Sequence, residues 1–78
     1  MSITTKLEPG TEVRYTEFRL SRMGDRDQKR FRGQIGVVTG YRGQIKDLPD
    51  PIVVFPKFGR FKEEKIFELP FKDLEIAK

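Results

Sequence analysis

The sequence predicts a single small all-β domain, a barrel of about five strands. Its length of 78 residues suits one domain with a small core. Hydrophobic residues alternate with polar ones over several short segments, which is the period of strands. Four glycines stand at spacings of three, four and three around a short β-branched segment: Gly33, Gly36, Gly40 and Gly43. Because glycine has no Cβ, this spacing favours a sharply bent strand in a small barrel.

The first part of the chain predicts a tail, one strand and a long loop. Residues 1–8 show no periodicity and precede a Pro-Gly turn signal, so we expect a flexible N-terminal tail here and the barrel domain over residues 9–78. The first strand is expected to begin at Thr11. The polar segment 16–32 predicts a long loop, with no helix longer than one turn. Loops of this length are often functional, so we expect a binding surface here.

Four further strands and one 3₁₀ turn are expected after the loop. They are a strand at about 34–41, a buried strand at 52–55, a strand at about 64–69, a 3₁₀ turn at 70–73 and a short last strand carrying Leu74 and Ile76. Five short strands, a long first loop and a 3₁₀ turn before the last strand describe an SH3-like barrel. The apolar residues expected to share its core are Val13, Ile35, Val37, Val53, Phe55, Phe67, Leu69, Leu74 and Ile76. We expect Gly36 where the strand bends or another backbone passes closely.

Positive charge is concentrated in the predicted loop. The chain has a net charge of +4, from 16 Lys and Arg against 12 Asp and Glu. The segment 19–32 carries six basic and two acidic residues, so its own net charge of +4 equals that of the whole chain. Such a loop attracts an anionic macromolecule, either RNA or DNA or an acidic protein surface, in a salt-sensitive way. A loop kept charged only for solvation is the alternative that the sequence leaves open.

The composition disfavours an enzymatic function. The chain has no His, Cys or Trp, which removes the commonest general base, the commonest nucleophile pairings and most transition-metal ligands. Asp25 and Asp27 resemble the start of a calcium loop, but Lys29 stands where the next oxygen ligand belongs. We therefore expect no enzyme activity, no catalytic residue, no metal, no cofactor and no small-molecule substrate.

The same composition bears on location. No apolar run approaches the roughly 20 residues that span a bilayer, so we expect no membrane partner. The absence of cysteine fits a reducing compartment. The expected location is the cytoplasm.

Basic and aromatic residues that lie close together in the sequence are the candidates for a binding surface. Arginines can hold phosphates while neighbouring rings stack on bases. Two Phe on one basic turn are hard to bury together, whereas Phe31 is expected in the core. For Tyr41 a core position and a binding role are equally open. The candidate binding residues are Arg19, Arg22, Arg26, Lys29, Arg30, Arg32, Tyr41, Arg42, Phe58, Arg60 and Phe61.

One glycine-bearing segment resembles a known motif. Its residues are Arg30-Phe31-Arg32-Gly33-Gln34-Ile35-Gly36-Val37-Val38. This run is similar to the KOW motif, the glycine-bearing strand pair of ribosomal and transcription-elongation proteins. Its continuation to Gly43 is similar to the archaeal and eukaryotic large-subunit ribosomal protein of the L21e type. The resemblance implies a KOW-like SH3-like barrel that contacts nucleic acid or a ribonucleoprotein or transcription machine through its basic loop.

A looser likeness extends over residues 33–76. It is carried by Gly33-x-x-Gly36-x-Val38, Tyr41-x-Gly43, Leu48-Pro49-x-Pro51-Ile52-Val53-Val54-Phe55, Phe67 and Asp73-Leu74-Glu75. These residues resemble the variable chain of ferredoxin-thioredoxin reductase and related small barrel subunits of photosynthetic and nitrogen-fixation complexes. The resemblance implies an alternative function: a non-catalytic accessory subunit that docks on a protein partner, for example in a ferredoxin-linked redox complex.

Overall fold

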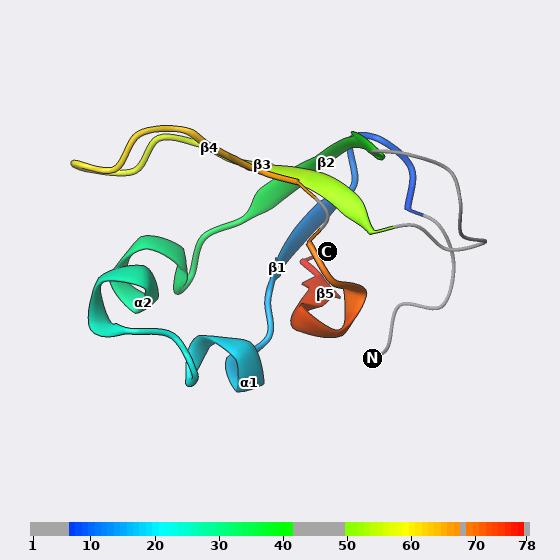
Figure 1. Cartoon of the computed structure of the whole chain (residues 1–78). Helices are drawn as coiled ribbons and strands as arrows, with labels where there is room; N and C mark the ends of the chain where they lie inside the picture. The colour runs from blue at the N-terminus through cyan, green and yellow to red at the C-terminus, as the bar shows by residue number, and fades with distance from the viewer. Residues whose placement is uncertain (1–6, 42–49, 68, 78) are drawn as a thin grey trace.

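The computed structural model describes residues 7–41, 50–67 and 69–77, which form one antiparallel sheet of five strands (Figure 1). The strands are β1 (Glu12–Tyr15), β2 (Gly36–Tyr41), β3 (Pro51–Phe55), β4 (Glu64–Ile66) and β5 (Leu74–Ile76). Their order across the sheet is β4-β3-β2-β1-β5, so β4 and β5 are its two edges. No pairing joins these edges within the described residues. The prediction of a small β domain with five strands is confirmed, and the sheet is open.

The segment between β1 and β2 is helical, so the prediction of a long loop there is wrong. It contains α1 (Glu17–Leu20) and α2 (Asp25–Phe31), and the seven residues of α2 exceed the single turn that we expected. The Thr16 hydroxyl caps α1 by accepting the Arg19 amide at 3.1 Å. Acidic residues in the first turn of α2 and basic residues in its last turn complement the helix dipole. These local signals outweigh the polar composition that predicted a loop.

An aromatic cluster forms the centre of the core. The rings of Tyr15, Phe31 and Phe55 lie with centroids 5.0 to 5.5 Å apart, in stacked and edge-to-face geometry. Phe31, at the end of α2, is therefore in the core as predicted. The other buried apolar residues are Leu7, Val13, Leu20, Val38, Val53, Leu69 and Leu74. Since Leu20 and Phe31 both come from the helical segment, the core holds α1 and α2 against the sheet.

Three of the residues expected in the core lie outside it. Ile35, Phe67 and Ile76 are each more than two-fifths exposed, and Val37 is half-buried. Gly36 and Val38 are the inward-facing residues of β2, so its odd-numbered neighbours face outward, because side chains alternate along a strand. Phe67 follows β4, which ends at Ile66 rather than at Leu69 as expected.

Both ends of the described chain pack against the rest of the domain. The predicted 3₁₀ turn is present at Phe71–Asp73, directly before β5. Leu7 is buried, so the flexible tail that we expected over residues 1–8 does not include it, and residues 1–6 lie outside the described residues.

Within the described ranges, no helix is long and apolar enough to cross a membrane.

Candidate nucleic-acid interface

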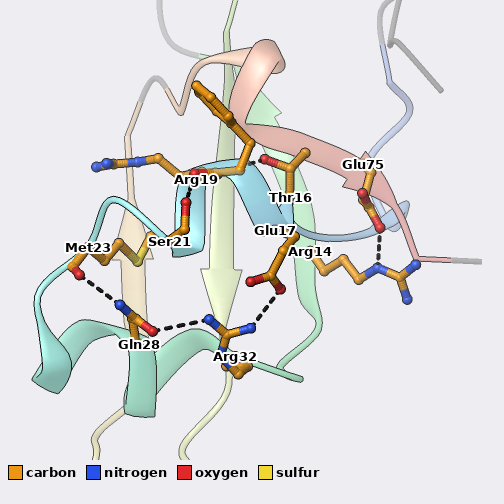
Figure 2. A network of polar contacts seen from close by, with 10 residues as sticks. Arg14, Thr16, Glu17, Arg19, Ser21, Met23, Gln28, Arg32 and Glu75 are labelled. Atoms are coloured by element: carbon orange, nitrogen blue, oxygen red, sulfur yellow. Dashed lines mark hydrogen bonds and ion pairs between the residues drawn. The ribbon is translucent and has the colours of Figure 1, made fainter.

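Several of the predicted binding cations are held by contacts within the chain. Arg32 donates from Nη1 to the Glu17 carboxylate at 2.6 Å and from Nη2 to the Gln28 side chain at 3.1 Å (Figure 2). Arg19 lies 3.5 Å from the Asp73 carboxylate. The Arg22 guanidinium lies over the Phe18 ring, 4.4 Å from its centroid. These contacts fasten α1 and α2 to each other and to the 3₁₀ turn.

Arg30 has a structural role that its sequence position did not predict. Its side chain is 2% exposed, so it cannot present its charge to a partner. Its Nη2 donates to three backbone carbonyls, those of Phe55 at 3.3 Å, Pro56 at 3.0 Å and Lys62 at 3.1 Å. The Phe55 carbonyl ends β3, and the other two belong to the connection between β3 and β4. Arg30 therefore joins the last turn of α2 to the base of the β3–β4 hairpin.

The positive charge of Arg30 is only partly compensated by neighbouring groups. The Glu64 carboxylate lies 3.6 Å from its Nε, beyond hydrogen-bond distance. Within the described residues, Nε and Nη1 are buried and have no hydrogen-bond partner. A buried charge costs free energy unless it is paired, so the three carbonyls, the Glu64 carboxylate and the rings of Phe31 and Phe61 together offset the cost of burying the guanidinium.

The hairpin that Arg30 holds ends in a tight turn. Phe58 and Phe61 exchange backbone hydrogen bonds, from Phe58 N to Phe61 O at 3.0 Å and from Phe61 N to Phe58 O at 2.8 Å. Gly59 has φ of +56°, a conformation that residues with a Cβ rarely adopt. Phe61 faces the Arg30 guanidinium, whose Cζ is 5.8 Å from the ring centroid. Phe58 is 44% exposed.

A cavity of about 330 Å³ lies between α2 and this turn. Its lining residues are Arg26, Phe58, Gly59, Arg60 and Phe61, and we call it the α2–turn cavity. Arg26 reaches it because it lies one helical turn before Arg30, on the same face of α2. Figure 1 shows α2 and the end of the β3–β4 hairpin on the same side of the molecule. None of the described residues that line it carries a carboxylate.

A second cavity, on another part of α2, has mixed charge. It measures about 430 Å³ and is lined by Asp25, Gln28, Lys29 and Arg32. Asp25 brings a negative charge to it, and Arg32 is already bound to Glu17 and Gln28. This cavity is therefore less suited to an anion than the α2–turn cavity.

Comparisons with known proteins identify no relative. The chain matches no protein-family model, no curated protein and no solved structure. In the part of the chain that the structure describes, no three Asp, Glu, His or Cys side chains come together in a way that could hold a metal ion.

The sequence candidates thus divide into separate groups. Arg26, Phe58, Arg60 and Phe61 come together from two distant segments, and Gly59, which is not among the candidate binding residues, lines the same cavity. Arg19, Arg22, Lys29, Arg30 and Arg32 lie elsewhere on the helical segment. Tyr41 is half-buried, with its hydroxyl accepting the Leu7 amide at 2.6 Å and donating to the Leu7 carbonyl at 2.7 Å. Arg42 lies outside the described residues.

Proposed function

We propose that this chain is a non-catalytic binding module that contacts nucleic acid through the α2–turn cavity. The observation that carries the proposal is the lining itself: two guanidinium groups and two aromatic rings on one concave surface, where none of the described lining residues has a carboxylate. Within the described residues, neither Arg26 nor Arg60 forms an ion pair. Both guanidinium groups are therefore free to bind an anion.

The pairing of arginine with exposed aromatic rings favours nucleic acid over an acidic protein surface. The planar guanidinium binds phosphate oxygens in a bidentate way, and an aromatic ring beside it offers a stacking plane to a base. A carboxylate on a protein surface would satisfy the arginines but would leave the Phe58 ring without a flat partner. Nucleic acid uses both parts of the surface.

The charges around the cavity limit how much of a polyanion can be bound. Asp25 and Asp27 occupy the first turn of α2, and Glu63 and Glu64 follow the 58–61 turn. These carboxylates repel phosphates, so we expect close contact with about two phosphates rather than with a long tract.

We also propose that the five-stranded sheet is the sheet of an SH3-like barrel of the KOW-like kind. The supporting observations are the antiparallel strand order β5-β1-β2-β3-β4 and the 3₁₀ turn between the two edge strands. The glycine-bearing segment that resembles the KOW motif covers the end of α2 and the start of β2. A binding surface beside that segment fits the function that the resemblance implies.

Salt dependence of binding tests the proposed function. We expect the affinity for single-stranded RNA to fall with salt with a log–log slope of about −1.4 for two phosphate contacts, near −0.7 for each. The double variant Arg26→Gln, Arg60→Gln should bring this slope close to zero, because each lost phosphate contact removes about 0.7 from its magnitude. Fluorescence anisotropy of labelled oligonucleotides in a NaCl series measures both quantities.

A matched variant controls for net charge. Arg14→Gln, Lys72→Gln removes the same two charges near β5, where Arg14 already pairs with Glu75 at 2.6 Å, and should leave most of the slope in place. Equal effects of the two double variants would show that only net charge matters. Absence of nucleic-acid binding, together with a nuclease-resistant association with an acidic protein that the cavity variant abolishes, would favour the accessory-subunit function instead.

A further inference from the structure

We infer that the α2–turn cavity is a subsite for one unpaired nucleotide, with its base stacked on Phe58 and its flanking phosphates held by Arg26 and Arg60. This inference rests on the proposed function and adds to it that the partner is single-stranded. It follows from three features of the cavity, which concern its size, the placing of its rings and the source of its charges.

The size of the cavity limits what it can hold. Its volume of about 330 Å³ lies at the small end of ligand pockets, which run from roughly 300 to 1,000 Å³. A groove that followed a duplex would have to continue beyond these five residues. One unpaired base with its two neighbouring phosphates suits this volume better than a base pair. In a duplex, a base pair presents only its edges to a protein.

The rings are placed as a fixed stacking surface. Reciprocal backbone hydrogen bonds between residues 58 and 61 close the turn, and Arg30 fixes the Phe61 side of it. Phe58 remains 44% exposed although it is large and apolar. A duplex keeps its bases paired and stacked, so such a ring reaches a base face in it only when a base is flipped out or a base step is pried apart, and both cost unstacking free energy. An unpaired base can stack on it directly.

The charges come from two separate elements that border the rings. Arg26 projects from α2 and Arg60 from the turn, and both line the same cavity as the two Phe residues. A strand bound in the cavity would therefore place a base at the rings while its phosphates meet the two arginines. This is the arrangement by which single-stranded nucleic acid is commonly held, where stacking and phosphate contacts occur together.

The experiment uses Phe58→Trp, because the chain has no Trp and the new indole is the only one. Its fluorescence should be quenched when a uridine oligonucleotide of about 12 nucleotides binds. An abasic oligonucleotide with the same number of phosphates should bind more weakly and should not quench. Phe18→Trp is the matched control, since Phe18 is 64% exposed and also lies beside an arginine, and it should show no quenching.

A second variant measures the contribution of the ring. Phe58→Ala should weaken binding of the uridine oligonucleotide by about 5- to 150-fold, the usual range for one stacked base. Binding of duplex DNA should change much less. Circular dichroism at the same temperature checks that the variant is folded.

The outcomes separate this inference from the proposed function. Salt-dependent binding in which uridine, abasic and duplex probes behave alike, with no quenching of the indole at position 58, would overturn the inference and leave the proposed function standing. Failure of all three probes to bind would overturn both. Quenching by the uridine probe alone, with loss of affinity in Phe58→Ala, would support the single-nucleotide subsite.

Discussion

At the scale of single residues, the side chains that face position 36 leave room for glycine but not for a residue with a Cβ. It lies at the start of β2 without a positive φ, and a Cβ built on it would stand 2.6 Å from Val53 Cγ1 and 3.0 Å from a Phe55 ring atom. Val53 and Phe55 are fully buried and cannot move aside cheaply. The space beside this glycine is therefore filled by side chains and not by the backbone that we expected to pass there.

We predict that Gly36→Ala lowers the free energy of unfolding by about 1 to 3 kcal/mol, the usual cost of overpacking a core. The reduced entropy of the unfolded chain offsets less than about 1 kcal/mol of this loss. Urea denaturation followed by circular dichroism gives the value. Gly24→Ala is the control, because Gly24 has nothing within 4 Å of the added Cβ. Equal stability of the two variants would contradict the prediction.

Tyr15 gives the core a response to alkaline pH. Burial is the main reason that the pKa of its phenol rises from 10.0 to about 12, with Arg19 lowering it and Asp73 raising it further. A raised folded-state pKa means that the full stabilisation is present below pH 10 and is lost as pH rises from 10 to 12. The loss amounts to about 2 to 3 kcal/mol for a shift of this size.

Tyr15→Phe should remove this response while keeping the ring contacts with Phe31 and Phe55. We expect the variant to differ little from the wild type at neutral pH and to lose less stability between pH 10 and 12. Denaturation midpoints at several pH values measure the difference. Parallel curves for the two proteins would show that Tyr15 is not the titrating group.

At the scale of elements, Arg30 determines how α2 meets the β3–β4 hairpin. We predict that Arg30→Lys lowers the free energy of unfolding by about 1 to 3 kcal/mol, because a buried ammonium is more strongly hydrated than a guanidinium and loses the planar contact with the Phe31 and Phe61 rings. Arg32→Lys, at an exposed arginine on the same helix, should change it by less than about 0.5 kcal/mol. Similar losses in both variants would argue against the special role of Arg30.

The elements also show what the sequence could predict. Strands were found because β-branched and aromatic residues alternate, but the inward face of β2 was predicted one residue out of phase. Gly36 faces inward and contributes no side chain, so the hydrophobic pattern followed Ile35 and Val37 instead. The helices were missed because few apolar residues mark them, although the Thr16 cap and the charge order along α2 were present in the sequence.

For the candidate site, composition found the residue types but not their grouping. Arg26 and Phe58 are 32 positions apart, and the contacts of Arg30 with the hairpin help to bring them to one cavity. The burial of Arg30 itself had no sequence signal, since it stands in a run of exposed cations. Charge density therefore predicted a basic surface on the helical segment but not the cavity at its border.

At the scale of the whole molecule, the last strand completes the sheet beside the first. β5 pairs with β1 from Val13↔Ile76 to Tyr15↔Leu74, and Leu74 is buried. We predict that a chain ending after Asp73 does not fold, because it exposes β1 and leaves a gap in a small core. Loss of the cooperative thermal transition in circular dichroism would confirm this. A cooperative transition in the shortened chain would contradict it.

The shortness of the two edge strands has a consequence for behaviour at high concentration. β4 and β5 have three residues each, against six in β2, and they carry Glu64, Lys65 and Glu75. An edge strand is a template on which another chain can add by backbone hydrogen bonds, and short, charged edges make a poor template. Such edges discourage fibril growth, so seeding by copies of the folded protein should be inefficient even in concentrated solution.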